Sequence, residues 1–284
     1  MSERIYCSES NESEPMAGTA DVVDVWLLLE YRPAWKAKAL PESDLAAPTI
    51  AWIDECIAAF AGLGLRARPQ LIRQPEIDRD DVRLLVGHGD RLLQFRGRGY
   101  DFLHDLDLTA LADGRLPEGA EVLDDPRYFV CTNGQRDMCC ARFGLPVYQD
   151  LRERVGDRAW QVSHLGGHRF APNVLVLPQG VLYGRVHPDL LDGFARETES
   201  GRLSMPHLRG RSYYPKHVQA AEAMSGRSDL KLLHVAGDDQ AATVTFATPD
   251  GSVKVAVQRA GEPIEVLSSC ANEAVDQVFP YRLG

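Results

Sequence analysis

The pattern of hydrophobic and polar positions divides the chain into alternating buried strands and amphipathic helices. Residues 22–31 form a nearly continuous apolar run rich in strand-forming residues, which predicts a buried strand. Residues 49–63 place apolar side chains at helical spacing before two glycines, which predicts a helix. Strands are also predicted over 66–73, 82–86 and 92–95, and a helix over 101–112. This order of elements indicates a layered α/β fold.

The second segment of the chain repeats this order. It predicts a strand over 128–131, a helix over 140–155 interrupted near Gly144, a strand over 160–162, a hairpin over 173–186 and a helix over 188–198. Both segments close with strand, glycine turn, strand, helix and then the tripeptide Gly-Arg-Leu, at 114–116 and at 201–203. We infer a degenerate internal duplication, in which the first copy is a scaffold without candidate ligands.

The C-terminal part has a different pattern. From residue 230 onward short alternating strands follow one another, with a hairpin turn at Asp250-Gly251, which predicts a small antiparallel sheet. The polar and acidic residues at the N-terminus predict a loosely attached tail and contain no signal-peptide core. We therefore expect a flexible tail (1–18), a degenerate first half (19–120), a second half that carries the site loops (121–203) and a C-terminal helix with a β subdomain (204–284).

One short window, residues 127–173, concentrates the candidate chemistry. It holds Cys131, Cys139, Cys140, His164 and His168. Eight residues separate Cys131 from Cys140 and three separate the two histidines, and both pairs lie in predicted loops at one edge of an α/β unit. Thiolate and neutral imidazole are the side chains that bind zinc, copper and iron–sulfur clusters most readily. Two sulfurs and two nitrogens form a complete set of four ligands.

Three types of chemistry suit these residues. They are a [2Fe–2S] cluster, a structural zinc ion, and thiol redox chemistry at the adjacent Cys139 and Cys140. Zinc also takes two cysteines and two histidines, although eight residues between the cysteines is a long spacing for it. A disulfide between adjacent cysteines is strained, and the chain has no C-x-x-C motif. The residues alone leave cluster and zinc open, and Cys7, Cys56 and Cys270 are interpreted as ordinary or structural thiols.

Composition narrows the class of protein. A net charge of −10 argues against nucleic-acid binding, and no apolar run is long enough for a membrane helix. Six cysteines in 284 residues do not form a disulfide framework, which favours a reducing compartment, so we expect a cytoplasmic protein. The chain has neither a dinucleotide fingerprint nor a phosphate loop, which favours a carrier over a complete enzyme.

The chain resembles the sucrase/ferredoxin-like family over most of its length. The resemblance lies in the opening CS…MAGTA…WLLLE, in FVCTNGQRDMCC and in HLGGHRFAPN, and residues 172–203 are similar to the end of thioredoxin-like [2Fe–2S] ferredoxins. It implies two thioredoxin-like halves followed by the C-terminal sheet. It also implies a [2Fe–2S] cluster held by Cys131, Cys140, His164 and His168, with Cys139 as the alternative to Cys140.

This resemblance implies an electron-transfer protein. Two neutral imidazoles in place of two thiolates make the cluster less negative, so we expect a Rieske-like potential of roughly −150 to +300 mV. The free N–H of each ligated imidazole can titrate, so we also expect coupled proton uptake. The partners would be redox donor and acceptor proteins. A zinc-stabilised Cys2His2 binding protein is the alternative.

Overall fold

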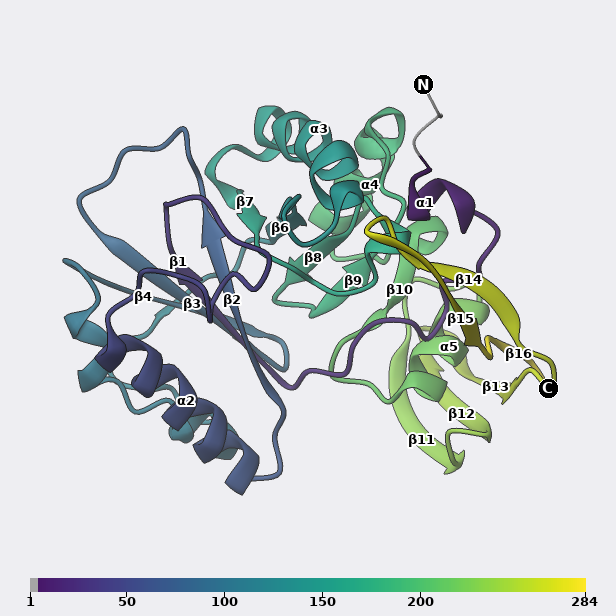
Figure 1. Ribbon diagram of the computed structural model, residues 1–284. Helices are drawn as coiled ribbons and strands as arrows, with labels where there is room; N and C mark the ends of the chain where they lie inside the picture. The colour runs from purple at the N-terminus through teal and green to yellow at the C-terminus, as the bar shows by residue number, and fades with distance from the viewer. Residues whose placement is uncertain (1–4) are drawn as a thin grey trace.

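A ten-stranded mixed sheet forms the centre of the molecule (Figure 1). The computed structural model describes residues 5–284, apart from the side chains of residues 272 and 273, so residues 1–4 of the expected tail lie outside the described residues. The strand order is β10-β9-β8-β6-β7-β2-β1-β3-β4-β5. The strands are β1 (Val25–Glu30), β2 (Ala67–Arg73), β3 (Val82–His88), β4 (Arg91–Gly97), β5 (Glu121–Val122), β6 (Arg127–Cys131), β7 (Ala159–Val162), β8 (Val174–Leu177), β9 (Val181–Tyr183) and β10 (Leu208–Arg211).

The two halves of this sheet share one topology. In the first half β1 pairs in parallel with β2 across the helix α2 (Ala47–Gly62), and β3 and β4 follow as antiparallel strands. In the second half β6 pairs in parallel with β7 across α3 (Met138–Val155), and β8 and β9 follow in the same way. Two helix-containing units of identical strand order confirm the predicted α/β fold with two thioredoxin-like halves.

The halves meet at equivalent strands. β2 and β7 each occupy the outer parallel position of their own half, and they pair with each other antiparallel through Ile72↔Val162 and Arg73↔Gln161. Antiparallel pairing of equivalent strands is the arrangement that a local twofold axis produces. The two halves are therefore related to each other in the way that the two subunits of a symmetric dimer are.

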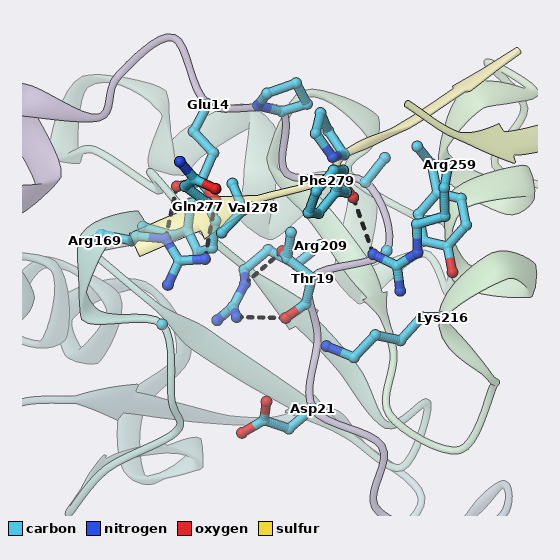
Figure 2. A pocket seen from close by; sticks show the side chains of 17 residues that line it. Glu14, Thr19, Asp21, Arg169, Arg209, Lys216, Arg259, Gln277, Val278 and Phe279 are labelled. Atoms are coloured by element: carbon cyan, nitrogen blue, oxygen red, sulfur yellow. Dashed lines mark hydrogen bonds and ion pairs between the residues drawn. The ribbon is translucent and has the colours of Figure 1, made fainter. Parts of the chain in front are cut away.

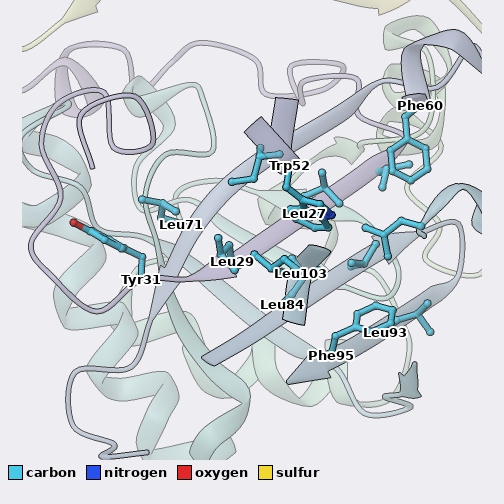
Figure 3. Packing of buried hydrophobic residues seen from close by; sticks show 14 of the residues in the cluster. Leu27, Leu29, Tyr31, Trp52, Phe60, Leu71, Leu84, Leu93, Phe95 and Leu103 are labelled. Atoms are coloured by element: carbon cyan, nitrogen blue, oxygen red, sulfur yellow. The ribbon is translucent and has the colours of Figure 1, made fainter. Parts of the chain in front are cut away.

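Helices cover one face of each half. In the first half, Leu27 and Leu29 of β1 pack against Trp52 and Phe60 of α2 (Figure 3). In the second half, β6 packs Tyr128 and Val130 against α3 and against α4 (Leu191–Glu199). Burying each large apolar side chain contributes about 1.5–3 kcal/mol.

The opposite faces of the two halves form one shared core. Trp26 and Leu28 of β1 belong to the same buried cluster as Phe129 of β6. A Cβ added to Gly87 of β3 would lie 2.8 Å from the side chain of Leu177 in β8, although four other strands separate β3 from β8 in the sheet. The sheet is therefore curled, with this core on its inner side.

The C-terminal region adds two antiparallel pieces. A four-stranded sheet, in the order β11-β12-β13-β16, packs against the helix α5 (Lys216–Met224), which confirms the predicted small antiparallel sheet. A separate hairpin consists of β14 (Ile264–Ser269) and β15 (Asn272–Val278). The strands of the sheet are β11 (Lys231–Gly237), β12 (Ala241–Thr248), β13 (Gly251–Arg259) and β16 (Tyr281–Leu283). β10 belongs to the large sheet, and the division of the chain at residues 120 and 203 stays a prediction.

The N-terminal segment differs from the expected loose tail in its described part. Residues Cys7–Ser10 form the short helix α1, and Cys7 is fully buried. Asn11 donates from Nδ2 to the carbonyl of Leu267 over 2.8 Å and accepts from its N–H over 2.9 Å. Figure 1 shows α1 beside the hairpin β14–β15, so the N-terminal segment packs against the C-terminal region.

Candidate metal centres

Three of the four predicted ligands converge. Cys131 ends β6, Cys140 lies in the first turn of α3, and His164 follows β7. Their ligand atoms all lie within 4.8 Å of one another, and 3.9 Å separates Cys131 Sγ from His164 Nδ1. Both cysteines are buried, whereas His164 is half-buried. The result is a compact donor set of two sulfurs and one nitrogen, which we call the first centre.

Close contact between α3 and β6 brings the two cysteines together. A Cβ on Gly144 would lie 2.2 Å from the carbonyl oxygen of Cys131, so only glycine permits this approach. Asp137 caps the N-terminus of α3, and its Oδ1 accepts from the N–H of Cys139 over 3.0 Å. α3 runs through Gly144 and Pro146 without the predicted interruption.

The two cysteines of the first centre differ in their protonation. A hydrogen bond from the Cys140 thiol lowers the pKa of Cys131 well below its usual range; His164 and the N–H of Leu165 contribute in the same direction against burial. The same hydrogen bond, with burial, raises the pKa of Cys140. Cys131 therefore loses its proton more readily than Cys140, and the thiolate is the form that binds metals.

The first half of the protein positions the loop that carries His164. Gln70 of β2 accepts from the backbone N–H of His164 over 3.0 Å, and Arg68 donates to the carbonyl of His164 over 3.1 Å. His164 also borders a cavity of about 290 Å³ that Arg68 and Arg136 line. The scaffold half thus contributes no ligand to the first centre but fixes one of its loops.

A buried arginine supports the same loop from the other side. Gly166 and Gly167 adopt left-handed φ angles of 81° and 68°, and a Cβ on Gly167 would lie 2.5 Å from Arg209 Nη2. Arg209 donates to the carbonyl of Gly166 over 2.9 Å and to Asn173 Oδ1 over 2.8 Å, and burial lowers its pKa to about 10. Arg209 also lines a neighbouring cavity of about 480 Å³, together with Lys216 and Arg169 (Figure 2).

His168 stands apart from the three converged ligands. Its Nε2 lies 2.6 Å from the carbonyl oxygen of Ser268 in the C-terminal hairpin and 3.6 Å from Asp137 Oδ2. Its Nδ1 is buried and has no hydrogen-bond partner among the described residues. The rings of His164 and His168 are 5.9 Å apart between centroids.

The adjacent cysteines face different groups. Cys140, not Cys139, lies beside Cys131. Cys139 lies with Cys7, Cys270 and Asp137 in a second group, which the sequence analysis missed. No local pattern indicates that group, because at least 130 residues separate each of these three cysteines from the next.

Comparison with known proteins identifies the family. The model of the family described as sucrase/ferredoxin-like matches residues 16–210. The chain belongs to the sucrase/ferredoxin-like family. The resemblance expected from the sequence motifs is thereby confirmed, and all residues of the first centre lie inside the matched range. No solved structure matches the chain.

Three similar curated proteins carry the name "Altered inheritance of mitochondria protein 32". Identity is 34% over 92 residues with the protein of Clavispora lusitaniae, 33% over 82 residues with that of Debaryomyces hansenii, and 28% over 99 residues with that of Meyerozyma guilliermondii. The alignments cover 29%, 25% and 31% of this chain, and 34%, 30% and 35% of the relatives. The chain therefore spans about a third of the length of these relatives.

The prediction of an electron-transfer protein carrying a Rieske-like Cys2His2 [2Fe–2S] cluster is wrong as the function of this protein, because the family description and the names of the relatives support no electron-transfer role. The structure gathers three of the four side chains, and His168 contacts Ser268 and Asp137 instead. The zinc alternative with the same four ligands is wrong because a single ion cannot contact all four, since His168 lies outside the group of donor atoms within 4.8 Å of one another. Neither the family description nor the names of the relatives refer to electron transfer beyond the word ferredoxin. What remains is a set of cysteine and histidine side chains able to bind a metal.

No helix among the described residues combines the length and the apolar character needed to cross a membrane.

Proposed function

We propose that this protein is a metal-binding protein whose first centre uses Cys131, Cys140 and His164 as ligands. The observation that carries the proposal is the convergence of these three donor atoms, from three separate elements, within 4.8 Å of one another. Two thiolates and an imidazole suit zinc and iron better than magnesium or calcium, which prefer oxygen. The lowered pKa of Cys131 favours its thiolate, which is the form that binds metals.

The cofactor we propose for this centre is a [2Fe–2S] cluster. A cluster with two irons is wider than a single ion, so it can reach a ligand outside the group of three. His168 supplies a suitable donor, because its Nδ1 is buried without a partner among the described residues while Nε2 faces the carbonyl of Ser268. Metal-bound histidines usually donate their other N–H to such an oxygen. This proposal concerns what the site binds, and it assigns no electron-transfer reaction to the protein.

The compartment and the partners also stay proposals. All six cysteines are free thiols, which supports a reducing compartment such as the cytoplasm. The relatives are named for the inheritance of mitochondria, and those words identify no ligand. The net charge of −10 supports the absence of nucleic-acid partners, and redox partner proteins stay a prediction.

Metal analysis of anaerobically purified protein tests the proposal. We expect about two irons and two acid-labile sulfides per chain, with loss of both in Cys131→Ser, Cys140→Ser and His164→Ala. His168→Ala should weaken the cluster, whereas replacing the exposed His234 of β11 by alanine should leave iron and sulfide unchanged. If the first centre holds one metal ion and no sulfide, it binds a single ion and not a [2Fe–2S] cluster. If Cys131→Ser and His164→Ala keep the full metal content, the centre itself is refuted.

A further inference from the structure

The second group of cysteines forms a compact triangle of sulfur atoms. The Sγ atoms of Cys139 and Cys270 are 3.0 Å apart, and Cys7 Sγ lies 3.5 Å from each of them. Ligand atoms of these three cysteines and of Asp137 all lie within 4.8 Å of one another. Cys7 and Cys139 are fully buried, and Cys270 is half-buried. Buried cysteines that only fill space in a core need not place their sulfur atoms together, so the close approach of these three sulfurs calls for a separate explanation.

The four residues of this group come from three distant parts of the chain. Cys7 lies in α1, Asp137 and Cys139 at the start of α3, and Cys270 in the turn between β14 and β15. Both Cys7 and Cys270 lie outside residues 16–210, the range that matches the family model. Cys140 and His164 belong to the first centre, so the two groups share no ligand.

We propose that Cys7, Cys139, Cys270 and Asp137 form a second metal site, which binds Zn²⁺ through three thiolates and one carboxylate oxygen. Tetrahedral zinc with Zn–S bonds of about 2.3 Å holds its sulfurs about 3.8 Å apart. The observed separations of 3.0–3.5 Å therefore widen by less than an ångström when the ion enters. Mixed thiolate and carboxylate ligation is within the range that zinc accepts.

The surroundings of Cys139 already favour a thiolate. The hydroxyl of Ser8 donates to Cys139 Sγ over 3.2 Å, and Cys139 lies in the first turn of the 18-residue helix α3, where the helix dipole stabilises negative charge. Thiolate is the form that binds zinc, so binding of Zn²⁺ would release the thiol protons of this group to solvent.

Asp137 is held in place for ligation by the same segments. Its Oδ2 accepts from the N–H of Cys270 and from the hydroxyl of Ser269, each over 3.0 Å. Its Oδ1 accepts from the N–H of Cys139 and lies 3.8 Å from Cys7 Sγ. A zinc ion here would join both ends of the chain to the centre of the molecule. It would also fix the hairpin whose Ser268 carbonyl meets His168.

Zinc content separates this site from the first centre. Wild-type protein purified in reducing buffer should retain one zinc per chain that survives Cys131→Ser. Cys7→Ser and Cys270→Ser should each lose that zinc while the iron and sulfide of the first centre stay. Cys56→Ser is the matched control, because Cys56 lies in α2, outside both groups, and it should keep all metal. Zinc that persists in both Cys7→Ser and Cys270→Ser overturns the site.

Alkylation of the cysteines in the wild-type protein tests the zinc site without variants, which can fail to fold. The zinc-loaded protein and the same protein after chelation are treated with an alkylating reagent, and the labelled cysteines are identified by peptide mass spectrometry. Chelation should raise the labelling of Cys7, Cys139 and Cys270 together, at least several-fold, and leave that of Cys56 unchanged. Labelling that does not respond to chelation, or a disulfide between two of the three cysteines in reducing buffer, contradicts the proposal.

Discussion

At the scale of single residues, Gly144 controls how closely α3 approaches β6. Its missing side chain leaves room for the carbonyl of Cys131, which a Cβ would approach to 2.2 Å. Gly144→Ala should therefore push α3 away from the first centre. We expect a loss of roughly 1–3 kcal/mol in unfolding free energy by the general cost of overpacking. Iron bound at the first centre should fall at the same time, as measured by metal analysis and urea denaturation.

Gly193 provides the matched control for this substitution. It is also a helical glycine, in α4, but a Cβ there meets only one arginine side-chain atom, at 3.9 Å. Gly193→Ala should be neutral or stabilise the protein by about 0.5–1 kcal/mol, because alanine favours helix. Equal losses of stability and iron in both variants would show that the contact with Cys131 is unimportant.

The residue scale also shows what sequence could and could not predict about the site. The positions of Cys131, Cys140 and His164 are predictable from the sequence, because Cys131 ends a predicted strand, Cys140 begins a predicted helix and His164 follows a predicted strand. The surroundings of His168 are not predictable from the sequence, because the residue it contacts, Ser268, lies 100 residues later, in the C-terminal hairpin. Cys7 and Cys270 were interpreted as ordinary thiols for the same reason. Their meeting with Cys139 depends on tertiary contacts that no periodicity encodes.

At the scale of elements, the periodic segments were predictable and the exceptions have local causes. The helix predicted over 101–112 is instead two 3₁₀ turns, η1 (Asp101–Asp105) and η2 (Thr109–Asp113). Between them Asp107 Oδ1 accepts from the N–H and hydroxyl of Thr109, over 2.9 and 2.6 Å, and such a bond competes with helix. α3 continues through Gly144 because its buried stripe extends on to Tyr148 and Leu151.

A buried ion pair joins β10 of the large sheet to α5 of the C-terminal region. Arg211 Nε lies 2.8 Å from Oε1 of Glu222, whose side chain is completely buried. Arg211→Met should cost about 3–5 kcal/mol in unfolding free energy at pH 7, because it leaves a buried carboxylate unpaired. Replacing both partners, as Arg211→Met with Glu222→Leu, should recover most of this loss. Chemical denaturation of the three proteins measures these differences.

The penalty of Arg211→Met should depend on pH. Burial raises the pKa of Glu222 even against the opposing effect of Arg211, so without Arg211 the folded protein favours the protonated carboxyl more strongly. The unfolded value for a glutamate is about 4.3, and a higher pKa in the folded state means that the protonated carboxyl stabilises the fold at low pH. This stabilisation is lost as the pH rises through the folded-state pKa. The penalty should therefore shrink toward pH 5 and grow toward pH 8. The double variant should show no such slope, and a penalty that grows on acidification would refute this account.

At the scale of the whole molecule, the curled sheet makes the two halves dependent on each other. The β2–β7 junction has only two paired positions, but the inner core contains side chains from both halves, among them Trp26, Ile72 and Trp160. The sequence predicted two copies of one unit. It did not show which edges join, because the β2 and β7 sequences differ and pairing of edge strands has no periodic signature.

This shared core predicts that both halves unfold in one transition. A variant that keeps only Trp52 reports on the α2 side of the first half, and a variant that keeps only Trp160 reports on the part of the shared inner core that β7 of the second half contributes. With the other tryptophans replaced by phenylalanine, each variant's fluorescence midpoint in urea should coincide with its own circular-dichroism midpoint. Ile72→Ala, at the junction, should cost about 2–5 kcal/mol and shift both reporters equally. A first half that unfolds while Trp160 stays buried would show instead that the halves are separate folding units.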